Sequence, residues 1–388
     1  MPSPAPASPS ALPSAAEETY VATYPLGSDA NECTRAAPCA TVGRALQHTA
    51  RMGRVNVAAG VYAERISLDF DQSVTIQGAG QDRTVFDGRW QGQVAFVPGG
   101  ATLQLADLTV FRGSGSRGGA ISNYGNLTIV RTLVTASLAA ELGGGIASSG
   151  ELTVKDSTIT GNQSTNQGGG ISTSGGGNLT MSGSTVQNNV VVPGNSEMFE
   201  GFFQPSGAGL FIAHRADIRS STFADNYLPY GRGGAIFNAY WLDGSHVTVF
   251  NNYAGQGGGL FTWNRYTNTG TELEASLLIN NVGGNCESPG NMLGGDNRDD
   301  DGTCPIAVAI AQDRSLGPVQ ANGGPTATLA LIAASPAHGA VPDGYLCDGT
   351  DQRGVPRRYD NSTTCDVGAY QLVDPDPASP SPSATHTS

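Results

Sequence analysis

The sequence predicts an all-β protein built as a β-solenoid, in which a short coil of strands repeats along the chain. Three marks support this prediction, and all of them recur between Gly118 and Asn281. The first is a glycine pair or triplet before an aliphatic residue, the second is Ser-Thr-φ-x-x-Asn with φ apolar, and the third is an alternating apolar pair between them. Each period of about 25 residues therefore holds three short β-type segments joined by glycine and asparagine.

The glycine mark sets the period. Its aliphatic anchors are 25, 25, 39, 26 and 24 residues apart. They are Ile121, Ile146, Ile171, Leu210, Ile236 and Leu260. In stacked coils the glycines before them fall into one column, where a positive φ or a close backbone approach excludes a Cβ. The interval of 39 exceeds the period, so we expect an extra loop at Val190–Ser206.

The asparagine mark predicts a second column. Its members are Asn162, Asn189, Asn226, Asn252 and Asn281. One coil cannot bury its apolar face alone, so the coils stack at the strand spacing of about 4.8 Å, with parallel ladders along three faces. The asparagine amides can then hydrogen-bond along the column while the backbone bends. Both columns are interpreted as structural rather than catalytic.

The N-terminal part precedes the regular repeats. Residues 1–19 are rich in Pro, Ala and Ser, which is typical of a disordered linker. Residues 20–54 are expected to form an N-terminal cap with a short helix at Val42–Ala50, which would cover the edge of the first coil. The buried face of that helix is expected to consist of Val42, Ala45, Leu46 and Thr49. The β-helix proper is expected over residues 55–282.

The six cysteines form three pairs of sequence neighbours. They are Cys33 with Cys39, Cys286 with Cys304, and Cys347 with Cys365. Pairing between neighbours would staple three local loops near the ends of the solenoid. Disulfides indicate an oxidising, extracytoplasmic compartment. Met1–Glu18 has no apolar core and is not a signal peptide, so we expect the export signal to lie outside this chain, the alternative being free cysteines.

The charge pattern argues against several partners. The chain has 33 acidic and 20 basic residues, a net charge of −13, and Lys155 as its only lysine. An acidic chain without a basic stripe is not expected to bind nucleic acid or an anionic membrane. No run of 18 apolar residues occurs, so no transmembrane helix is expected. We expect a monomer.

The repeat marks carry a family resemblance. The pairing of Gly-Gly-Ala-Ile with φ-x-x-Asn resembles the repeats of the chlamydial polymorphic outer-membrane proteins, which are surface adhesins on right-handed β-helices. More generally, the coils are similar to the pectin-lyase-like superfamily, and the segment from Ala22 to Gly80 looks like the N-terminal entry of many secreted bacterial β-helix proteins. The resemblance implies a secreted or surface-displayed, single-stranded right-handed parallel β-helix.

The C-terminal part carries a second resemblance. Six motifs occur in order: Asp299–Cys304, Leu316–Pro318, Asn322–Thr326, Ser335–Ala337, Asp351–Gly354 and Cys365–Tyr370. Residues 283–372 thereby resemble the choice-of-anchor Q domain, the C-terminal part of many bacterial surface β-helix proteins. Gly339 and Gln371 stand where that family has acidic residues, so no role of those carboxylates is carried over. Residues 373–388 are expected to be a disordered Pro- and Ser-rich tail.

The pectin-lyase-like resemblance implies one candidate activity, cleavage of an acidic polysaccharide. A lyase needs a base to remove a proton next to a uronate carboxylate, and a glycoside hydrolase needs two carboxylates at a defined separation. The alternation of the strands points Lys155 outward beside Asp156, where a solvated surface is the simpler reading. Asp217, Arg219 and Asp243 also point outward and could form a carboxylate patch.

A partial calcium motif precedes Cys304. Asn297, Asp299 and Asp301 stand at the first three ligand positions of an Asx-x-Asp-x-Asp-Gly loop. The position of the closing bidentate glutamate is Val308, so the motif is incomplete. The alternative is a turn closed by Cys286 and Cys304. No cofactor is required, and Ca²⁺ is the one candidate ion.

Aromatic residues concentrate in one part of the chain. Fifteen of the 27 fall between Phe199 and Tyr266. In the coil register an outward position that holds Ser or Ala in early coils holds Phe in later ones. The candidate binding residues are Phe211, Phe237 and Phe261, with Tyr240, Trp241, Trp263 and Tyr266 from the same segments and Phe199, Phe202 and Phe203 from the extra loop. We expect an exposed row that binds a glycan or a surface protein. The alternative is a satellite core under the loop.

These observations lead to one functional hypothesis and a runner-up. The first is a non-catalytic protein for adhesion or for binding a glycan or protein partner, extracellular or at the cell surface. The second is a polysaccharide lyase or glycoside hydrolase that acts on an acidic polysaccharide. A groove lined by paired acids and an arginine would favour the enzyme, and a flat aromatic face would favour the binder.

Overall fold

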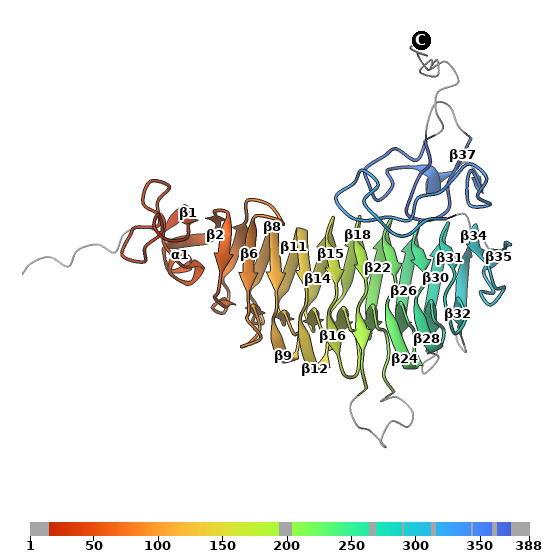
Figure 1. Ribbon diagram of the computed structural model, residues 1–388, viewed down its shortest axis with the longest axis horizontal. Helices are drawn as coiled ribbons and strands as arrows, with labels where there is room; N and C mark the ends of the chain where they lie inside the picture. Colours follow the sequence, from red (N-terminus) through yellow and green to blue (C-terminus); the bar gives the residue numbers. More distant parts are fainter. Residues whose placement is uncertain are drawn as a thin grey trace, which may run out of the picture.

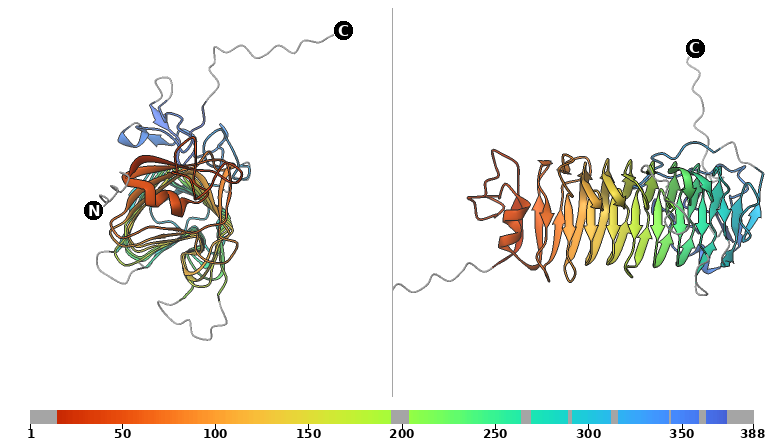
Figure 2. Two further views of the ribbon diagram at one scale, coloured as in Figure 1. Left: turned by 90° about the vertical axis from the view of Figure 1, so that its left-hand side faces the viewer. Right: turned by 90° about the horizontal axis from the view of Figure 1, so that it is seen from below.

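The protein is a stack of parallel β-coils with a compact C-terminal region along one side (Figure 1). The computed structural model describes residues 15–193, 204–263, 269–288, 291–311, 316–342, 344–358 and 363–373. Seen along the stack, the coils superimpose around a common interior, and seen from the side they form a straight column (Figure 2). The predicted β-solenoid is confirmed.

One coil shows how the chain winds. From β10 (Ile121–Asn123) it passes through β11 (Asn126–Thr135) and β12 (Leu138–Leu142), and it returns above its start at β13 (Ile146–Ser148). Strand β11 is bent at Arg131, whose φ is 43°, and its two halves pair with two different strands of the next coil. Each coil therefore carries four ladder positions, one more than the three segments that the sequence predicts.

Two of these ladders join in one sheet, which has 20 strands among the described residues. The first ladder contains β1 (Ala16–Val21), β2 (Thr49–Val57), β5 (Ser73–Gln77), β8 (Thr102–Phe111), β11, β14 (Glu151–Lys155), β18 (Leu179–Ser182), β22 (Arg215–Arg219), β26 (Trp241–Ser245), β30 (Gly270–Glu274) and β33 (Asn291–Gly295). The second contains β3 (Gly60–Tyr62), β6 (Thr84–Asp87), the second halves of β8 and β11, β15 (Thr158–Thr160), β19 (Thr185–Gln187), β23 (Thr222–Ala224), β27 (Thr248–Phe250), β31 (Leu277–Ile279), β34 (Asn297–Asp299) and β35 (Ala307–Ala309).

Two further parallel sheets close the coil, with nine and six strands among the described residues. The nine-stranded sheet contains β4 (Ile66–Ser67), β7 (Ala95–Val97), β10, β13, β17 (Ile171–Thr173), β21 (Leu210–Ile212), β25 (Ile236–Asn238), β29 (Leu260–Thr262) and β32 (Cys286–Glu287). The six-stranded sheet contains β9 (Ser114–Arg117), β12, β16 (Gln163–Ser164), β20 (Val190–Val191), β24 (Tyr227–Arg232) and β28 (Tyr253–Gln256). The main apolar core lies inside the coils and includes all six aliphatic anchors.

The glycine column is confirmed. Gly143 has a φ of 64°, and a Cβ on Gly144 would lie 2.2 Å from the carbonyl oxygen of Gly169 in the next coil. A side chain at this corner would strain the backbone or separate the coils. Of the extra loop expected at Val190–Ser206, residues 194–203 lie outside the described part of the chain.

The asparagine column is confirmed as a continuous hydrogen-bonded ladder. The backbone N–H and the side-chain Nδ2 of Asn162 both donate to Oδ1 of Asn189, each at 3.1 Å. Asn189 donates in the same way to Asn226, and Asn226 to Asn252. All of these side chains are buried, so the ladder satisfies polar groups that turn inward at a corner.

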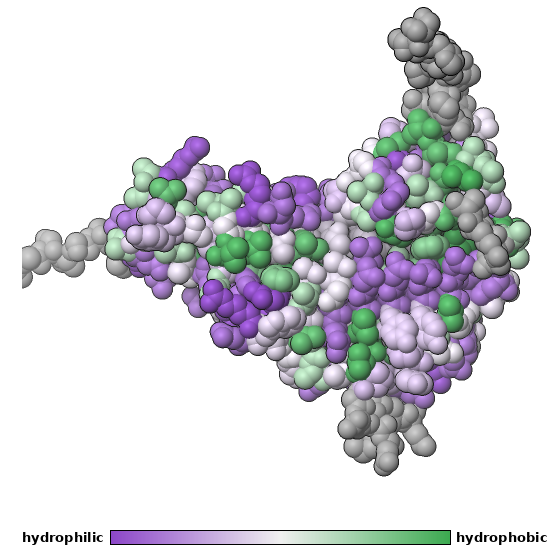
Figure 3. Space-filling model, viewed as in Figure 1, coloured by the Kyte–Doolittle hydropathy of each residue, from purple (hydrophilic) through white to green (hydrophobic). Residues whose placement is uncertain are grey.

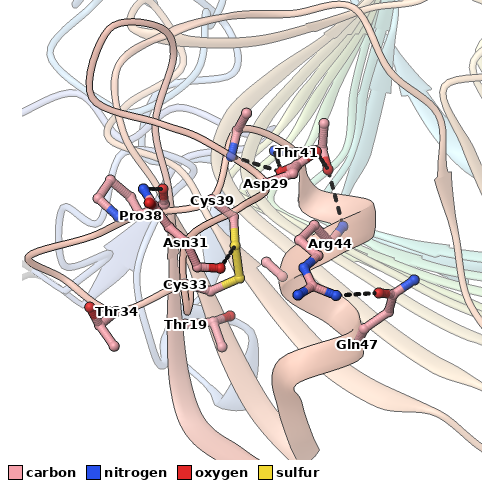
Figure 4. Close-up of a disulfide and its surroundings, with 12 residues drawn as sticks. Thr19, Asp29, Asn31, Cys33, Thr34, Pro38, Cys39, Thr41, Arg44 and Gln47 are labelled. Carbon is pink, nitrogen blue, oxygen red and sulfur yellow. Dashed lines mark hydrogen bonds between the residues drawn. A yellow bond between two sulfur atoms is a disulfide. The ribbon is translucent and has the colours of Figure 1, made fainter.

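The N-terminal part begins earlier than expected. Ala16–Val21 forms β1 and pairs in parallel with β2, so residues 16–19 of the predicted linker belong to a strand. Residues 1–14 lie outside the described part. Helix α1 (Val42–His48) follows, with Val42, Ala45 and Leu46 buried. Thr41 caps its N-terminus, and Asp29 in turn accepts hydrogen bonds from Thr41 (Figure 4). Figure 2 places α1 at the N-terminal end of the stack, and its capping role stays a prediction.

The C-terminal region folds back over the side of the coils. Outward threonines of the second ladder meet it on successive coils: Thr185 donates to the carbonyl of Ala327 at 2.6 Å, and Thr222 donates to Oε1 of Gln352 at 2.7 Å. Around β36 (Val341–Pro342), η2 (Tyr345–Cys347) and β37 (Thr364–Cys365) a second apolar core forms, which includes Leu277 and Ile279 of β31. The parallel ladders themselves run on to Ala309, past the residue 282 expected for the β-helix.

The three expected disulfides are confirmed. Cα–Cα distances are 4.6 Å for Cys33–Cys39, 4.9 Å for Cys286–Cys304 and 5.6 Å for Cys347–Cys365, all within the range of disulfides. Within the described residues no cysteine is left free. No helix of the described part has the length and apolar character to cross a membrane.

Candidate binding site

The phenylalanine row has the register that the sequence predicts. Phe211, Phe237 and Phe261 lie on successive coils of the nine-stranded sheet, outside the main core. Neighbouring ring centroids are 5.3 Å apart, and the rings are nearly parallel. The predicted stacking is therefore confirmed.

The expected exposure of this row is wrong. The three rings are only 3, 4 and 3% exposed, because they form a separate apolar cluster with Ala239, Ala213 and Trp263. The guanidinium of Arg232 lies 5.2 Å from the centre of the Phe261 ring and 5.0 Å from that of Trp263. The alternative, a satellite core, describes the row better. Phe199, Phe202, Phe203 and Tyr266 lie outside the described residues.

Tyr240 and Trp241, in contrast, line an open depression of about 570 Å³. Both are half-buried. The ring of Tyr240 stacks on that of His214, with centroids 5.2 Å apart and 3° between the planes. His214 is held in turn by Asn178, whose Oδ1 lies 2.9 Å from Nδ1. Two of the predicted binding residues thus meet in one concave site, which we call the aromatic platform.

Local backbone structure positions the platform. Asn238, at the end of β25, is fully buried and accepts a hydrogen bond from the backbone N–H of Tyr240 at 3.0 Å. Its Nδ2 donates to the carbonyl of Gly270 in the next coil at 2.8 Å. A Cβ on Gly270 would lie 3.1 Å from the Trp241 ring, so the glycine gives that ring the space to extend along the stack. The sequence therefore sets the ring positions through one buried amide and one missing side chain.

The rest of the lining mixes polar side chains with one leucine, and it carries one charge among the described residues. Arg215, Trp241, Gly270 and Asn291 take equivalent places on four successive strands of the first ladder. Thr269 and the exposed Leu293 complete the lining. Since strands stack at about 4.8 Å, the site extends roughly 14 Å along the stack. Arg215 is its charged group, and no carboxylate belongs to the part of the lining that the structure describes.

A second aromatic pair is one that the sequence analysis missed. Tyr227 and Tyr253 lie on adjacent strands of the six-stranded sheet, 46 and 37% exposed, with ring centroids 5.0 Å apart. Each directly follows a ladder asparagine, Asn226 or Asn252. The residue directly after each ladder asparagine points away from the core. A tyrosine at that position in two successive coils was therefore the sequence signal for this exposed pair.

The carboxylates that a hydrolase would need are held by an arginine. Asp217 and Asp243 are partners on adjacent strands. Arg219 lies between them, with Nε 2.9 Å from Asp217 and Nη2 4.0 Å from Asp243. The single charge of Arg219 therefore faces two acids, with the shorter contact to Asp217. Lys155 points outward, as expected, but it lines a cleft beneath the C-terminal region instead of an open surface.

The three candidate calcium ligands accept hydrogen bonds, although Oδ1 of Asp299 is buried without a partner among the described residues. Asn297 accepts from the backbone N–H of Ser276, and Asp301 accepts from Thr303 and Asn285. Asp299 is fully buried, which raises the pKa of its carboxyl and opposes the charge that a calcium ligand needs. No cluster of three or more His, Cys, Asp or Glu suited to a metal occurs in the described part. Calcium binding stays an untested prediction.

Comparison with known proteins bears on the fold. Residues 100–275 match the family described as "Right handed beta helix region", which gives the coils their hand. A solved structure of pectate lyase Pel9A is 15% identical over 92% of this chain and 96% of that chain, with a TM-score of 0.49. A rhamnogalacturonan lyase is 12% identical over 77 and 85%, with a TM-score of 0.37. No curated protein matches the sequence. Neither structural likeness bears on the chemistry of this chain.

Proposed function

We propose that the protein binds a glycan on the aromatic platform and does not cleave it. The observation that supports this is the half-exposed pair Tyr240 and Trp241 in a concave site of about 570 Å³. Aromatic faces bury the C–H faces of sugar rings at a low cost in side-chain entropy. Polar groups at the rim, from Asn291 and Arg215, suit the hydroxyl groups of a sugar.

The shape of the platform supports a chain rather than a single sugar. Its four strand positions extend along the stack, so a ligand can contact several coils at once. Stacking of Tyr240 on His214 and the backbone bonds around Gly270 hold the rings before the ligand arrives. Such preorganisation reduces the entropy that binding must overcome.

Location and attachment belong to the same proposal. Three disulfides suit an oxidising compartment outside the cytoplasm. The resemblance of residues 283–372 to the choice-of-anchor Q domain supports display at a bacterial surface, and the repeat marks support adhesion as the outcome of glycan binding. Binding is favoured over cleavage because the described lining of the platform holds no carboxylate, and the acid pair Asp217 and Asp243 does not belong to it.

The test is a glycan array followed by affinity electrophoresis of the glycans that bind. Trp241→Ala is expected to weaken binding about tenfold or more, the loss that a hot-spot aromatic produces. Trp90→Ala is the matched control, because Trp90 is also a partly exposed tryptophan, 43% accessible, but lies far along the chain from the platform. Both variants should keep the wild-type circular dichroism spectrum.

Three results would count against the proposal. A wild-type protein that binds no glycan on the array would exclude glycan binding. Equal binding by Trp241→Ala and wild type would place the site elsewhere. Release of unsaturated uronate products or new reducing ends from a bound polysaccharide would establish cleavage in place of simple binding.

A further inference from the structure

A polar cleft of about 490 Å³ lies between the C-terminal region and the first ladder. Residues 346–357 form one wall, and the ends of β14, β18, β22 and β26 form the other. Figure 1 shows the C-terminal region beside these coils, and Figure 3 shows a hydrophilic band across the same face below it. The cleft is separate from the aromatic platform, which lies at the opposite ends of β22 and β26.

The coil wall of the cleft alternates cations and hydroxyl groups. Lys155, Ser182, Arg219 and Ser245 occupy equivalent places on four successive strands. Adjacent members are therefore about 4.8 Å apart along the stack. The hydroxyl of Ser182, between the two cations, makes no hydrogen bond to a described residue, and Lys155 forms no ion pair with one. Both side chains are available to a ligand.

The opposite wall contains a buried arginine without a carboxylate partner. Arg357 is 1% exposed, and its guanidinium donates only to neutral oxygens among the described residues: Ser220 Oγ at 3.1 Å, the carbonyl of Gly368 at 3.1 Å and that of Asp366 at 3.5 Å. Burial lowers the pKa of the Arg357 guanidinium to about 10, and the charges of Asp351 and Asp366 act in the opposite direction without a hydrogen bond from it to either carboxylate. Burial, with smaller contributions from Arg357 and Arg219, lowers the pKa of His246, which lines the same cleft.

The remaining charges of the cleft do not cancel this excess. Asp351 is neutralised by Arg353 at 2.8 Å, and Asp348 by Arg358 at 3.2 Å. The described lining as a whole holds four cations, Lys155, Arg219, Arg353 and Arg357, against three carboxylates, Asp156, Asp348 and Asp351. In a chain of net charge −13, a cleft with excess positive charge and open hydroxyl groups is suited to an anion.

We propose that this cleft binds an oxyanion, the carboxylate, sulfate or phosphate group of a small or sugar-linked ligand. Lys155 and the Ser182 hydroxyl donate to the oxygens of the group. Arg357 supplies a fixed positive charge behind them, and Arg219 closes the coil side. Because the C-terminal region provides one wall, the ligand would bridge it to the coils.

The only lysine of the sequence provides a direct probe. Reductive methylation with ¹³C-formaldehyde labels the amine of Lys155 and keeps its positive charge. The NMR signal of the labelled lysine is identified as the one that is missing in Lys155→Gln. Sodium phosphate, sulfate and glucuronate are titrated at constant ionic strength made up with chloride, with glucose as the neutral control. We expect a saturable shift with at least one oxyanion and none with glucose. A response to glucuronate alone identifies an acidic sugar, and a response to phosphate or sulfate alone identifies a tetrahedral anion.

Calorimetry of variants locates the site. Lys155→Gln should weaken oxyanion binding about tenfold, the effect of losing one hydrogen bond to a charged group, and Ser182→Ala should weaken it less. Arg117→Gln, which removes an exposed cation elsewhere, and Trp241→Ala, which removes the platform, should both bind as wild type does. The proposal is overturned if no oxyanion shifts the signal beyond chloride. It is also overturned if Lys155→Gln binds as tightly as wild type, or if Trp241→Ala abolishes binding.

Discussion

The asparagine ladder gives the most quantitative prediction of this fold, the cost of replacing Asn226 by leucine. Asn226 lies at the middle of the ladder and is fully buried. Its Oδ1 accepts from the backbone N–H and from Nδ2 of Asn189, both at 3.1 Å. Its Nδ2 donates to the carbonyl of Val186 at 3.0 Å and to Oδ1 of Asn252 at 2.9 Å. Leucine has a similar volume and can make none of these four bonds.

The magnitude follows from these four bonds. At about 0.5–1.5 kcal/mol for each hydrogen bond lost in a buried site, the variant should unfold with a free energy lower by about 2–6 kcal/mol. The upper part of the range is expected because the N–H of Asn189 is left buried without its acceptor. Coupling along the ladder acts in the same direction, since each amide polarises the next.

Urea unfolding followed by circular dichroism measures this difference. Asn126→Leu is the control, because Asn126 is exposed on β11 and makes one long bond of 3.4 Å to Thr102. That control should change the free energy of unfolding by less than about 0.5 kcal/mol. If Asn226→Leu is as stable as the control, the ladder does not stabilise the coils and the reasoning fails.

Three further predictions concern the core, pH and a disulfide. Phe237→Ala should lower the free energy of unfolding by about 3–5 kcal/mol, because the ring is buried between two others; an unchanged urea midpoint would mean that the row is accessible. Burial, with the charge of Arg357, lowers the pKa of His246 to about 2. The unfolded chain therefore binds the proton first as the pH falls. The free energy of unfolding should decrease below about pH 6.5, by up to about 1.4 kcal/mol per pH unit. His246→Gln should reduce that slope, and equal slopes for the variant and the wild type in acid titrations would contradict this. Replacing Cys286 and Cys304 by alanine should cost about 3 kcal/mol in urea, since their bridge closes a loop of 18 residues, and no loss would indicate that the bridge is not formed.

The periodic features were predictable from the sequence because they repeat. The column of Asn162 to Asn281 and the stacking of Phe211 on Phe237 follow from counting residues between marks. The bend inside β11 was not predictable in the same way. It depends on a left-handed residue that is Arg131 in one coil, Asp156 in the next and Gly183 after that, so no residue type marks it.

The repeat in the sequence did not predict which residues cover an outward-facing side chain. Alternation correctly placed Phe237 outside the main core, but its burial depends on Phe211, Phe261 and Trp263, which lie on neighbouring coils. Lys155 is a similar case. Its direction follows from alternation, whereas its place in a cleft depends on residues 346–357, roughly two hundred positions later in the chain. Contacts of this kind leave no local pattern.

Because the C-terminal region packs over earlier coils, the structure also implies an order in which parts of the protein fold during translation. Neighbouring coils are linked by contacts between residues about one period apart, such as Asn162 and Asn189, 27 residues apart. The bond from Gln352 to Thr185 spans 167 residues. As the chain leaves the ribosome, each coil can form on the one before it, because loops of this size close quickly. The threonine column therefore stays uncovered until residues 327 and 352 have been made. The cleft and the second apolar core form later than the coils on which they rest, because both need residues beyond 340.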